Sequence, residues 1–252
     1  TARMFAEKGA KLTITGRNAE TLKITKDLCL ASGARKDDIV AIIANLEDNE
    51  TPAKIIDGTV KAFGGIDVLV NNAGMALNDS EGRTHMDMPV DNFDRTIQVN
   101  VRSILVLTQL AVPHLEKTKG AVVNVSSIAA LPLGQTEFYY AISKAALDQL
   151  TVQMASNIIK KGIRVNSVNP GLVSTDIIRK TGIGEEAVKA LLSLGENPKI
   201  IPLGRVGQSS DISKLILFLS DRSQSEFIIG QRIVIDGGST LRNPLLSDWR
   251  TD

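Results

Sequence analysis

Apolar residues in this chain follow two alternating spacings, and the alternation predicts the order of its secondary structure. Short β-rich runs recur along the chain, separated by longer stretches with the three-to-four-residue spacing of amphipathic helices. Expected strands span Lys11–Thr15, Ile39–Ala44, Val68–Asn71, Ala121–Val125, Arg164–Val168 and Arg232–Ile235. Expected helices span Ala19–Ala31, Thr51–Phe63, Phe93–Leu115, Phe138–Lys160 and Ser210–Leu219.

Strands that alternate with helices predict an α/β fold. Such an order is typical of βαβ units, whose helices cover both faces of a mostly parallel, doubly wound sheet. The length of 252 residues and a hydrophobic content of 43% suit one domain with a substantial core. There is no linker, internal repeat or low-complexity tract. We therefore expect residues 1–252 to form a single domain.

Charge and cysteine usage exclude several kinds of partner. The net charge is +1 with both signs interspersed, so nothing indicates a nucleic-acid or anionic-membrane surface. No apolar run reaches the roughly 18 residues that span a bilayer. Cys29 is the single cysteine and is expected to be a buried thiol, which is consistent with a reducing, cytoplasmic location. Small neutral or modestly charged ligands are favoured.

Leu172–Leu203 interrupts the alternation. This excursion of roughly thirty residues lies between two strand-like runs and carries its own helical stretch around Glu185–Leu194. Such excursions are often lids over a substrate, and an ordinary surface excursion is the alternative. The polar tail, residues 242–252, is expected to be mobile or to reach across a subunit.

Tyr140 and Lys144 are the strongest candidates for chemistry. Residues four apart lie on one face of a helix, so the ammonium would lie beside the phenol. Tyrosine has an ordinary pKa of about 10, and a nearby cation lowers it toward the range of a useful acid or base. Ser127, thirteen residues upstream of Tyr140, could bind a carbonyl oxygen. Tyr139 and Ser126 are the competing assignments, and Tyr139 has no lysine four residues later.

Further motifs accompany this pair in a fixed order. They are Asn71-Asn72-Ala73-Gly74, Asn100 within Gln-Val-Asn-Val, Val123-Asn124-Val125-Ser126-Ser127, and Asn169-Pro170-Gly171. From residue 1 to about residue 240, the chain resembles the short-chain dehydrogenase/reductase family. The resemblance implies a Rossmann-like fold and hydride transfer between a nicotinamide cofactor and a carbonyl or alcohol carbon.

The resemblance also implies a role for each catalytic candidate. Tyr140 would be the general acid/base, and Lys144 would lower its pKa and hydrogen-bond the nicotinamide ribose. Ser127 would orient the substrate oxygen. Asn100 would hold a water molecule in a proton relay with Lys144, although a satisfied core amide is the alternative.

Cofactor contacts are expected after the ends of several strands. Gly16 stands where an NAD-preferring member usually has an acidic residue, and Arg17 follows it, so NADP(H) is favoured over NAD(H). Asn18 would join this contact or cap the next helix. The other expected contacts, besides Tyr140 and Lys144, are Asn45, Leu46, Asn72, Ala73, Gly74, Pro170, Gly171, Val173 and Thr175. Asn71 and Asn72 are also expected to brace neighbouring strands.

The beginning of the chain differs from the family pattern. Thr1–Ala10 reads as the body and end of a helix, and no Gly-x-x-x-Gly-x-Gly turn precedes any helix. In the family, such a turn holds the cofactor pyrophosphate and follows a central first strand. We therefore expect the sheet to lack its first strand and the chain to be an N-terminally truncated form of a longer protein.

The sequence also indicates where substrate would bind and how subunits would assemble. Substrate contacts should lie in Ala129–Phe138, which contains Glu137, and in the lid, with an apolar or mixed carbonyl substrate or its alcohol. Family members assemble through the helices around Phe93–Leu115 and Phe138–Lys160, so a homotetramer or homodimer is expected. His85 and His114 are too isolated for a metal site. A non-catalytic scaffold, or a non-redox isomerase or dehydratase, remains the alternative function.

Overall fold

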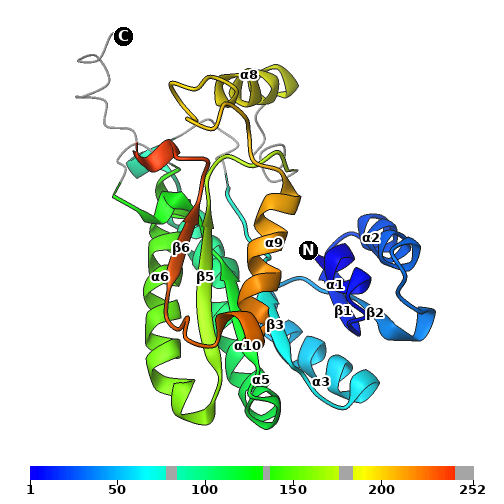
Figure 1. Cartoon of the computed structure of the whole chain (residues 1–252). Helices are drawn as coiled ribbons and strands as arrows, with labels where there is room; N and C mark the ends of the chain where they lie inside the picture. The colour runs from blue at the N-terminus through cyan, green and yellow to red at the C-terminus, as the bar shows by residue number, and fades with distance from the viewer. Residues whose placement is uncertain (78–83, 133–136, 176–183, 242–252) are drawn as a thin grey trace.

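The computed structural model describes residues 1–77, 84–132, 137–175 and 184–241 (Figure 1). Its strands are β1 (Leu12–Gly16), β2 (Ile39–Ile43), β3 (Val68–Asn71), β4 (Ala121–Val125), β5 (Arg164–Pro170) and β6 (Arg232–Ile235). Its helices are α1 (Ala2–Glu7), α2 (Ala19–Ala31), α3 (Thr51–Phe63), α4 (Val90–Ile97), α5 (Ser103–Thr118), α6 (Phe138–Ile158), α8 (Glu185–Gly195), α9 (Ser209–Ser220) and α10 (Arg222–Ser225). The tail, residues 242–252, lies outside the described residues.

Every strand pairing in the described chain is parallel. β1 pairs with β2 in one small sheet, and β3, β4, β5 and β6 pair in that order in a second sheet. The predicted parallel α/β fold is therefore confirmed. Among the residues that the structure describes, the two sheets share no hydrogen-bonded ladder. The expectation of a further strand upstream stays a prediction.

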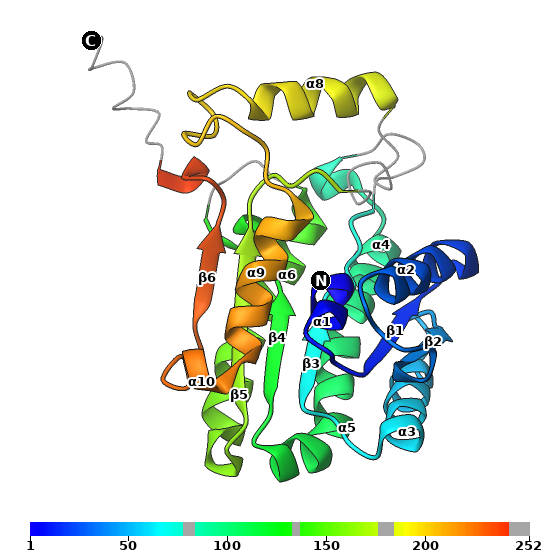
Figure 2. The ribbon, with the colours of Figure 1, turned by 45° about the vertical axis from the view of Figure 1, so that its right-hand side comes forward.

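Two helical layers cover the four-stranded sheet, because neighbouring strand residues point to opposite faces. Val122 and Val165 join the core cluster formed with α3, α5 and α6. Val123 and Val168 face the other way and pack against α9. Figure 2 shows α9 in front of β4 and β5, with α6 behind. The sheet is therefore covered on both faces, as a doubly wound fold requires.

The small sheet has its own core. Ala6, Ile14, Leu22, Cys29 and Ile39 pack together from α1, β1, α2 and β2. The thiol of Cys29 has no exposed surface, which confirms the predicted buried cysteine. Burial raises the pKa of this thiol, so it stays protonated at neutral pH.

A salt bridge and a hydrogen bond tie the small sheet to the helices beside the large one. Glu47, after β2, accepts from Arg95 Nε on α4 at 2.7 Å. Asn49 Oδ1 accepts from Gln98 Nε2 at 3.3 Å. These contacts hold the loop after β2 against α4 and the turn that follows it.

The predicted helix Phe93–Leu115 is not continuous, which corrects the sequence-based interpretation. It is divided into α4, a π-helical turn over Gln98–Arg102, and α5. The turn contains Asn100, whose side chain hydrogen-bonds the main chain of Met75. A wide turn places this amide against a neighbouring segment, and such turns often occur at functional sites.

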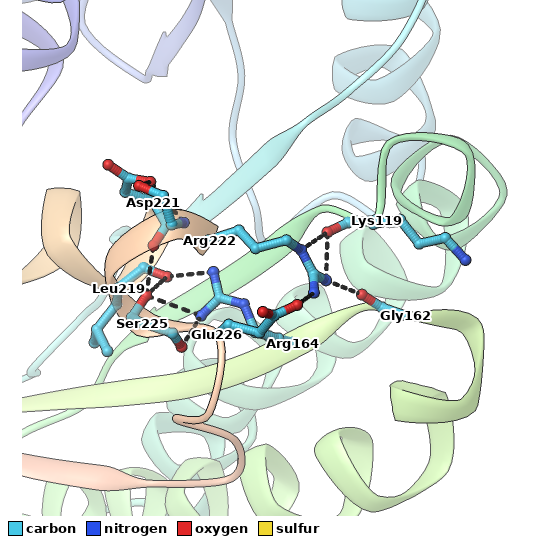
Figure 3. A network of polar contacts seen from close by, with 9 residues as sticks. Lys119, Gly162, Arg164, Leu219, Asp221, Arg222, Ser225 and Glu226 are labelled. Carbon is cyan, nitrogen blue, oxygen red and sulfur yellow. Dashed lines mark hydrogen bonds and ion pairs between the residues drawn. The ribbon is translucent and has the colours of Figure 1, made fainter.

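A buried arginine secures the amino-terminal end of β5. Arg164 donates through Nη1 to the Ser225 carbonyl at 3.0 Å and through Nη2 to the Leu219 carbonyl at 2.9 Å (Figure 3). Arg222 donates to the carbonyls of Lys119 and Gly162 beside it. The two guanidinium groups thereby satisfy carbonyls at the ends of α9 and α10 and in two turns.

Candidate active site

The candidate residues gather where parallel strands end. Arg17 follows β1, Asn45 follows β2, Asn72 follows β3 and Ser127 follows β4. Pro170 is the last residue of β5. In open α/β sheets, ligands bind outside the carboxyl ends of the strands. The fold therefore brings most of the predicted set to one edge.

Ser127 and Tyr140 meet above the end of β4. Ser127 leaves the strand in an extended conformation, and its Oγ accepts from the Ala129 main-chain N–H at 3.1 Å. A hydrogen bond with Ser127 tends to lower the pKa of the Tyr140 phenol. Burial has the larger effect, and together with the charge of Glu137 it raises that pKa to about 12.

Lys144 occupies the same face of α6 as Tyr140. Its Nζ donates to the Val125 carbonyl at 2.8 Å and lies 5.4 Å from the centroid of the Tyr140 ring. The residue is 2% exposed, and burial lowers the pKa of its ammonium to about 8. The expected lowering of the Tyr140 pKa by Lys144 does not appear in this structure. The ammonium is bonded to a main-chain carbonyl, and desolvation of the phenol outweighs the influence of a cation.

Asn100 lies beside Lys144 with its amide hydrogen-bonded on three sides. Its Oδ1 accepts from the Met75 N–H at 2.8 Å, and its Nδ2 donates to the Met75 carbonyl at 2.8 Å and to Ser143 Oγ at 2.9 Å. Both amide protons are therefore used, and only a lone pair of Oδ1 is left to bind a water molecule. A side chain added at Gly74 would place its Cβ 3.4 Å from Lys144 Nζ and 3.7 Å from Asn100 Oδ1.

The residues of the Asn-Asn-Ala-Gly segment, Asn71–Gly74, differ in burial and in partners. Asn71 is 4% exposed and donates to Asn124 Oδ1 at 2.9 Å, so it braces β3 against β4 as predicted. Asn72 and Ala73 are exposed. The predicted bracing role is therefore wrong for Asn72, because the chain has already left the strand there. Its exposure is compatible with a ligand contact.

A cavity of about 380 Å³ opens beside the ends of β1 and β2. Its lining consists of Arg17, Ile43, Ala44, Asn45, Asp48, Thr51 and Lys54. Two of the predicted cofactor contacts, Asn18 and Leu46, have partners within the protein. Asn18 caps α2 by accepting from the Thr21 N–H at 3.0 Å, and the side chain of Leu46 packs on the main core. The capping alternative for Asn18 is therefore the one present in the structure.

Pro170, Gly171, Val173 and Thr175 form the segment that leaves β5. A Cβ at Gly171 would lie 2.7 Å from the Cβ of Asp236, so only glycine fits this approach of two main chains. Val173 forms an isolated parallel bridge with Gly207, and its side chain packs on the core beside α9. This bridge closes the base of the excursion over Leu172–Leu203.

The excursion over Leu172–Leu203 is described in part. Residues 176–183 lie outside the described residues, as do residues 133–136 of the expected substrate segment. The helix expected around Glu185–Leu194 is present as α8, beyond the arrowheads of β4 and β6 (Figure 2). Within the described residues, no group of histidine, cysteine, aspartate and glutamate side chains could hold a metal ion. None of the described helices is long and apolar enough to cross a membrane.

Several buried polar residues of the site were not singled out from the sequence. Ser143 links α6 to Asn100, and Asp148 accepts from Asn169 Nδ2 at 2.7 Å. A carboxylate four residues after Lys144 on an apolar helix was the available signal for Asp148. Asn169 stood in a recognised motif without an assigned role.

Comparisons with known proteins agree with this geometry. The profile of a family described as Enoyl-(Acyl carrier protein) reductase matches residues 1–240. A 3-oxoacyl-[acyl-carrier-protein] reductase from Thermotoga maritima is 32% identical over 239 residues, covering 94% of this chain and 91% of the relative.

Solved structures extend the similarity to three dimensions. A short-chain dehydrogenase/reductase from Caenorhabditis elegans, crystallised with cofactor, superimposes with a TM-score of 0.94 at 42% identity, covering 97% of this chain and 91% of that one. Glucose dehydrogenase from the same organism, in its apo form, gives a TM-score of 0.79 at 40% identity, covering 96% and 91%.

The chain belongs to the short-chain dehydrogenase/reductase family. It is therefore a member of an oxidoreductase family whose enzymes use nicotinamide cofactors and act on small molecules.

Proposed function

We propose that the chain interconverts a carbonyl and a secondary alcohol with NADP(H), with Tyr140 as the general acid/base. The observation that carries the proposal is the convergence of Tyr140, Ser127 and Lys144 at the carboxyl end of β4. Packing alone gives no reason to bury a lysine beside a tyrosine, since an ammonium in the core is unfavourable. A proton-transfer site accounts for the arrangement.

Each side chain then has a defined task. Tyr140, with its pKa raised to about 12, is protonated at neutral pH and can donate its proton to a carbonyl oxygen during reduction. Ser127 donates a hydrogen bond to the same oxygen and orients it. Lys144 provides positive charge as the phenol loses its proton, and Asn100 places a hydrogen-bond acceptor beside it. The cofactor, when bound, supplies or accepts the hydride.

The choice of NADP(H) is supported by the cavity beside β1 and β2. Arg17 and Lys54 place two cations around it against the one carboxylate of Asp48, while Asn45 offers an amide to a base. A 2′-phosphate suits such cations. Arg17 Nη1 lies 3.9 Å from Glu47 Oε2, which is a weak surface ion pair. The guanidinium therefore loses little when it turns to a phosphate. The exposed Asn72 and Ala73 and the close approach at Gly74 fit the passage of a cofactor toward Lys144.

Substrate, assembly and location follow as parts of the proposal. The excursion over Leu172–Leu203 would cover a small carbonyl or alcohol substrate beside Glu137. Leu110 on α5 and Ile142 on α6 are 38% and 40% exposed, which supports an apolar contact between subunits of a homotetramer or homodimer. A cytoplasmic location agrees with the reduced thiol of Cys29.

Replacement of Tyr140 by phenylalanine tests the chemistry. Tyr140→Phe removes the proton donor and keeps the ring, so turnover with NADPH should fall by at least about 10²-fold. Quenching or enhancement of NADPH fluorescence should still saturate at a similar concentration. Tyr139→Phe is the matched control, since its hydroxyl donates to the Met88 carbonyl instead. Equal turnover in Tyr140→Phe and the parent would refute the assignment.

Replacement of Arg17 tests the cofactor. Arg17→Ser should raise the KM for NADPH by roughly tenfold or more, because a charge-assisted contact to phosphate is worth about 1.5–3 kcal/mol. The KM for NADH should change little. Parent protein without saturable NADPH binding would instead favour a non-catalytic scaffold, and substrate turnover without net cofactor oxidation would favour an isomerase or dehydratase.

A further inference from the structure

A buried carboxylate lies one helical turn beyond Lys144 and has no role in the mechanism above. Asp148 is 4% exposed on α6. Tyr140, Lys144 and Asp148 are spaced by four residues and therefore share one face of the helix. A carboxylate in the interior is unfavourable unless hydrogen bonds and opposite charge surround it. Its partners therefore indicate what it does.

The first partner connects Asp148 to Ser127. Asn169 Nδ2 donates to Asp148 Oδ2 at 2.7 Å and to the Ser127 carbonyl at 3.1 Å. Asn169 Oδ1 accepts from Ser167 Oγ at 2.9 Å. Donors and acceptor of this amide are all engaged, so its orientation is fixed. Asp148 thus fixes the side-chain amide of Asn169, and this amide in turn hydrogen-bonds the main-chain carbonyl of Ser127.

The second partner is the charge of Lys144. Burial lowers the pKa of Lys144, and the negative charge of Asp148 opposes that change. Asp148 is the residue whose charge acts on Lys144 in the described structure. Other charged or titratable groups on the described elements packed against α6, at its N-cap or on α6 itself, are Glu137, Tyr139, Tyr140, His85, Asp87, Asp91, Asp94, Arg95, Arg102, Lys160, Lys161 and Arg164. The charge of Glu137 acts on Tyr140, whereas that of Asp148 acts on Lys144.

None of those other groups can replace Asp148. The histidine, aspartates and arginines of the loop, α4 and the π-turn are exposed. Arg164 is at the amino-terminal end of β5, whereas the site lies at the carboxyl end. The loss of the Asp148 charge would therefore leave the buried ammonium without a counter-charge.

We propose that Asp148 is a positioning residue of this site: through Asn169 it fixes Ser127, and by its charge it keeps Lys144 in the ammonium form. The inference rests on the proposed function for its effect on turnover. Its structural part, a coupling between Asp148 and Lys144, does not depend on any substrate.

Asp148→Asn separates charge from hydrogen bonding, since the new Oδ1 can still accept from Asn169. Lys144 must stay protonated for turnover, so activity is lost as pH rises through its pKa. Asp148→Asn removes the negative charge that favours the ammonium, so the pKa of Lys144 is lower in the variant. The alkaline limb of the pH profile of kcat for carbonyl reduction should therefore shift to lower pH by on the order of one unit. An unchanged limb would overturn the charge role.

Asn169→Ala tests the other half. It removes the donor to the Ser127 carbonyl and to Asp148 Oδ2, and it leaves the negative charge of Asp148 in place. We expect kcat to fall more than KM rises, with the alkaline limb unmoved. A kcat equal to that of the parent would overturn the role of Asn169 in fixing Ser127.

Thr151→Val is the matched control for both variants. Thr151 is buried one turn further along α6, and its Oγ1 accepts from Asn124 Nδ2 at 2.9 Å. Its replacement removes a buried hydrogen bond between α6 and β4 without changing the charge near Lys144. Stability should fall, and the pH profile should not move.

A double-mutant cycle at pH 7 keeps the inference separate from the proposed function. Asp148→Asn should lower the urea midpoint of unfolding more in the parent than in a Lys144→Met background. Equal shifts in both backgrounds would overturn the inference whatever the activity. A larger shift in the parent, combined with no NADPH-dependent turnover, would support the coupling and refute the proposed function instead.

Discussion

Burial of the Lys144 ammonium predicts that replacing it will stabilise the folded chain while destroying activity. Below a pH of about 8 the lysine is charged in both folded and unfolded states. Its folded pKa, about 8, is below the ordinary 10.5, and each unit corresponds to about 1.4 kcal/mol. The buried charge therefore costs about 3 kcal/mol at pH 7.

Lys144→Met removes this charge and fills the same space. It also leaves the Val125 carbonyl without its donor, which costs about 1 kcal/mol. We expect a net gain of about 2 kcal/mol in the free energy of unfolding at pH 7. Because the folded pKa is depressed, the cost of the charge is fully present below pH 8 and disappears as pH rises from about 8 toward 10.5.

Urea unfolding followed by circular dichroism at pH 7 and pH 9.5 measures the effect. The gain of Lys144→Met over the parent should shrink by about 2 kcal/mol between the two pH values. Lys160→Met is the matched control, since Lys160 is exposed near the end of the same helix and should change stability by less than about 0.5 kcal/mol. A loss of stability at pH 7, or a gain that does not depend on pH, would refute the reasoning.

Two further predictions concern Glu137 and Gly171. The charge of Glu137 raises the pKa of Tyr140, so Glu137→Gln should move the acid limb of alcohol oxidation to lower pH; a shift to higher pH in the pH–rate profile would contradict this. Gly171→Ala would place a Cβ 2.7 Å from the Cβ and 2.9 Å from the Cα of Asp236, and should lower the free energy of unfolding by about 1–3 kcal/mol. Unchanged urea unfolding would show that the two main chains can separate without penalty.

Local patterns were sufficient for most elements. The bounds of α2, α3, β3, β4 and β6 agree with those expected from spacing and end signals. Such patterns are reliable because each element buries one face or stripe, and the spacing of apolar residues records it. The site could be expected at one edge for a similar reason, since its candidates follow strand ends.

The sequence by itself determined the parallel α/β order, the ends of β3, β4 and β6, and the spacing of Ser127, Tyr140 and Lys144. Only the tertiary structure decided how charged and polar groups face one another. It divided the predicted helix into α4 and α5 at a π-turn in which Asn100 hydrogen-bonds the main chain of Met75. It also gave Asn18 to a helix cap and brought Asp148 to Asn169. Burial and hydrogen-bond geometry depend on segments distant in the chain, so local spacing does not encode them.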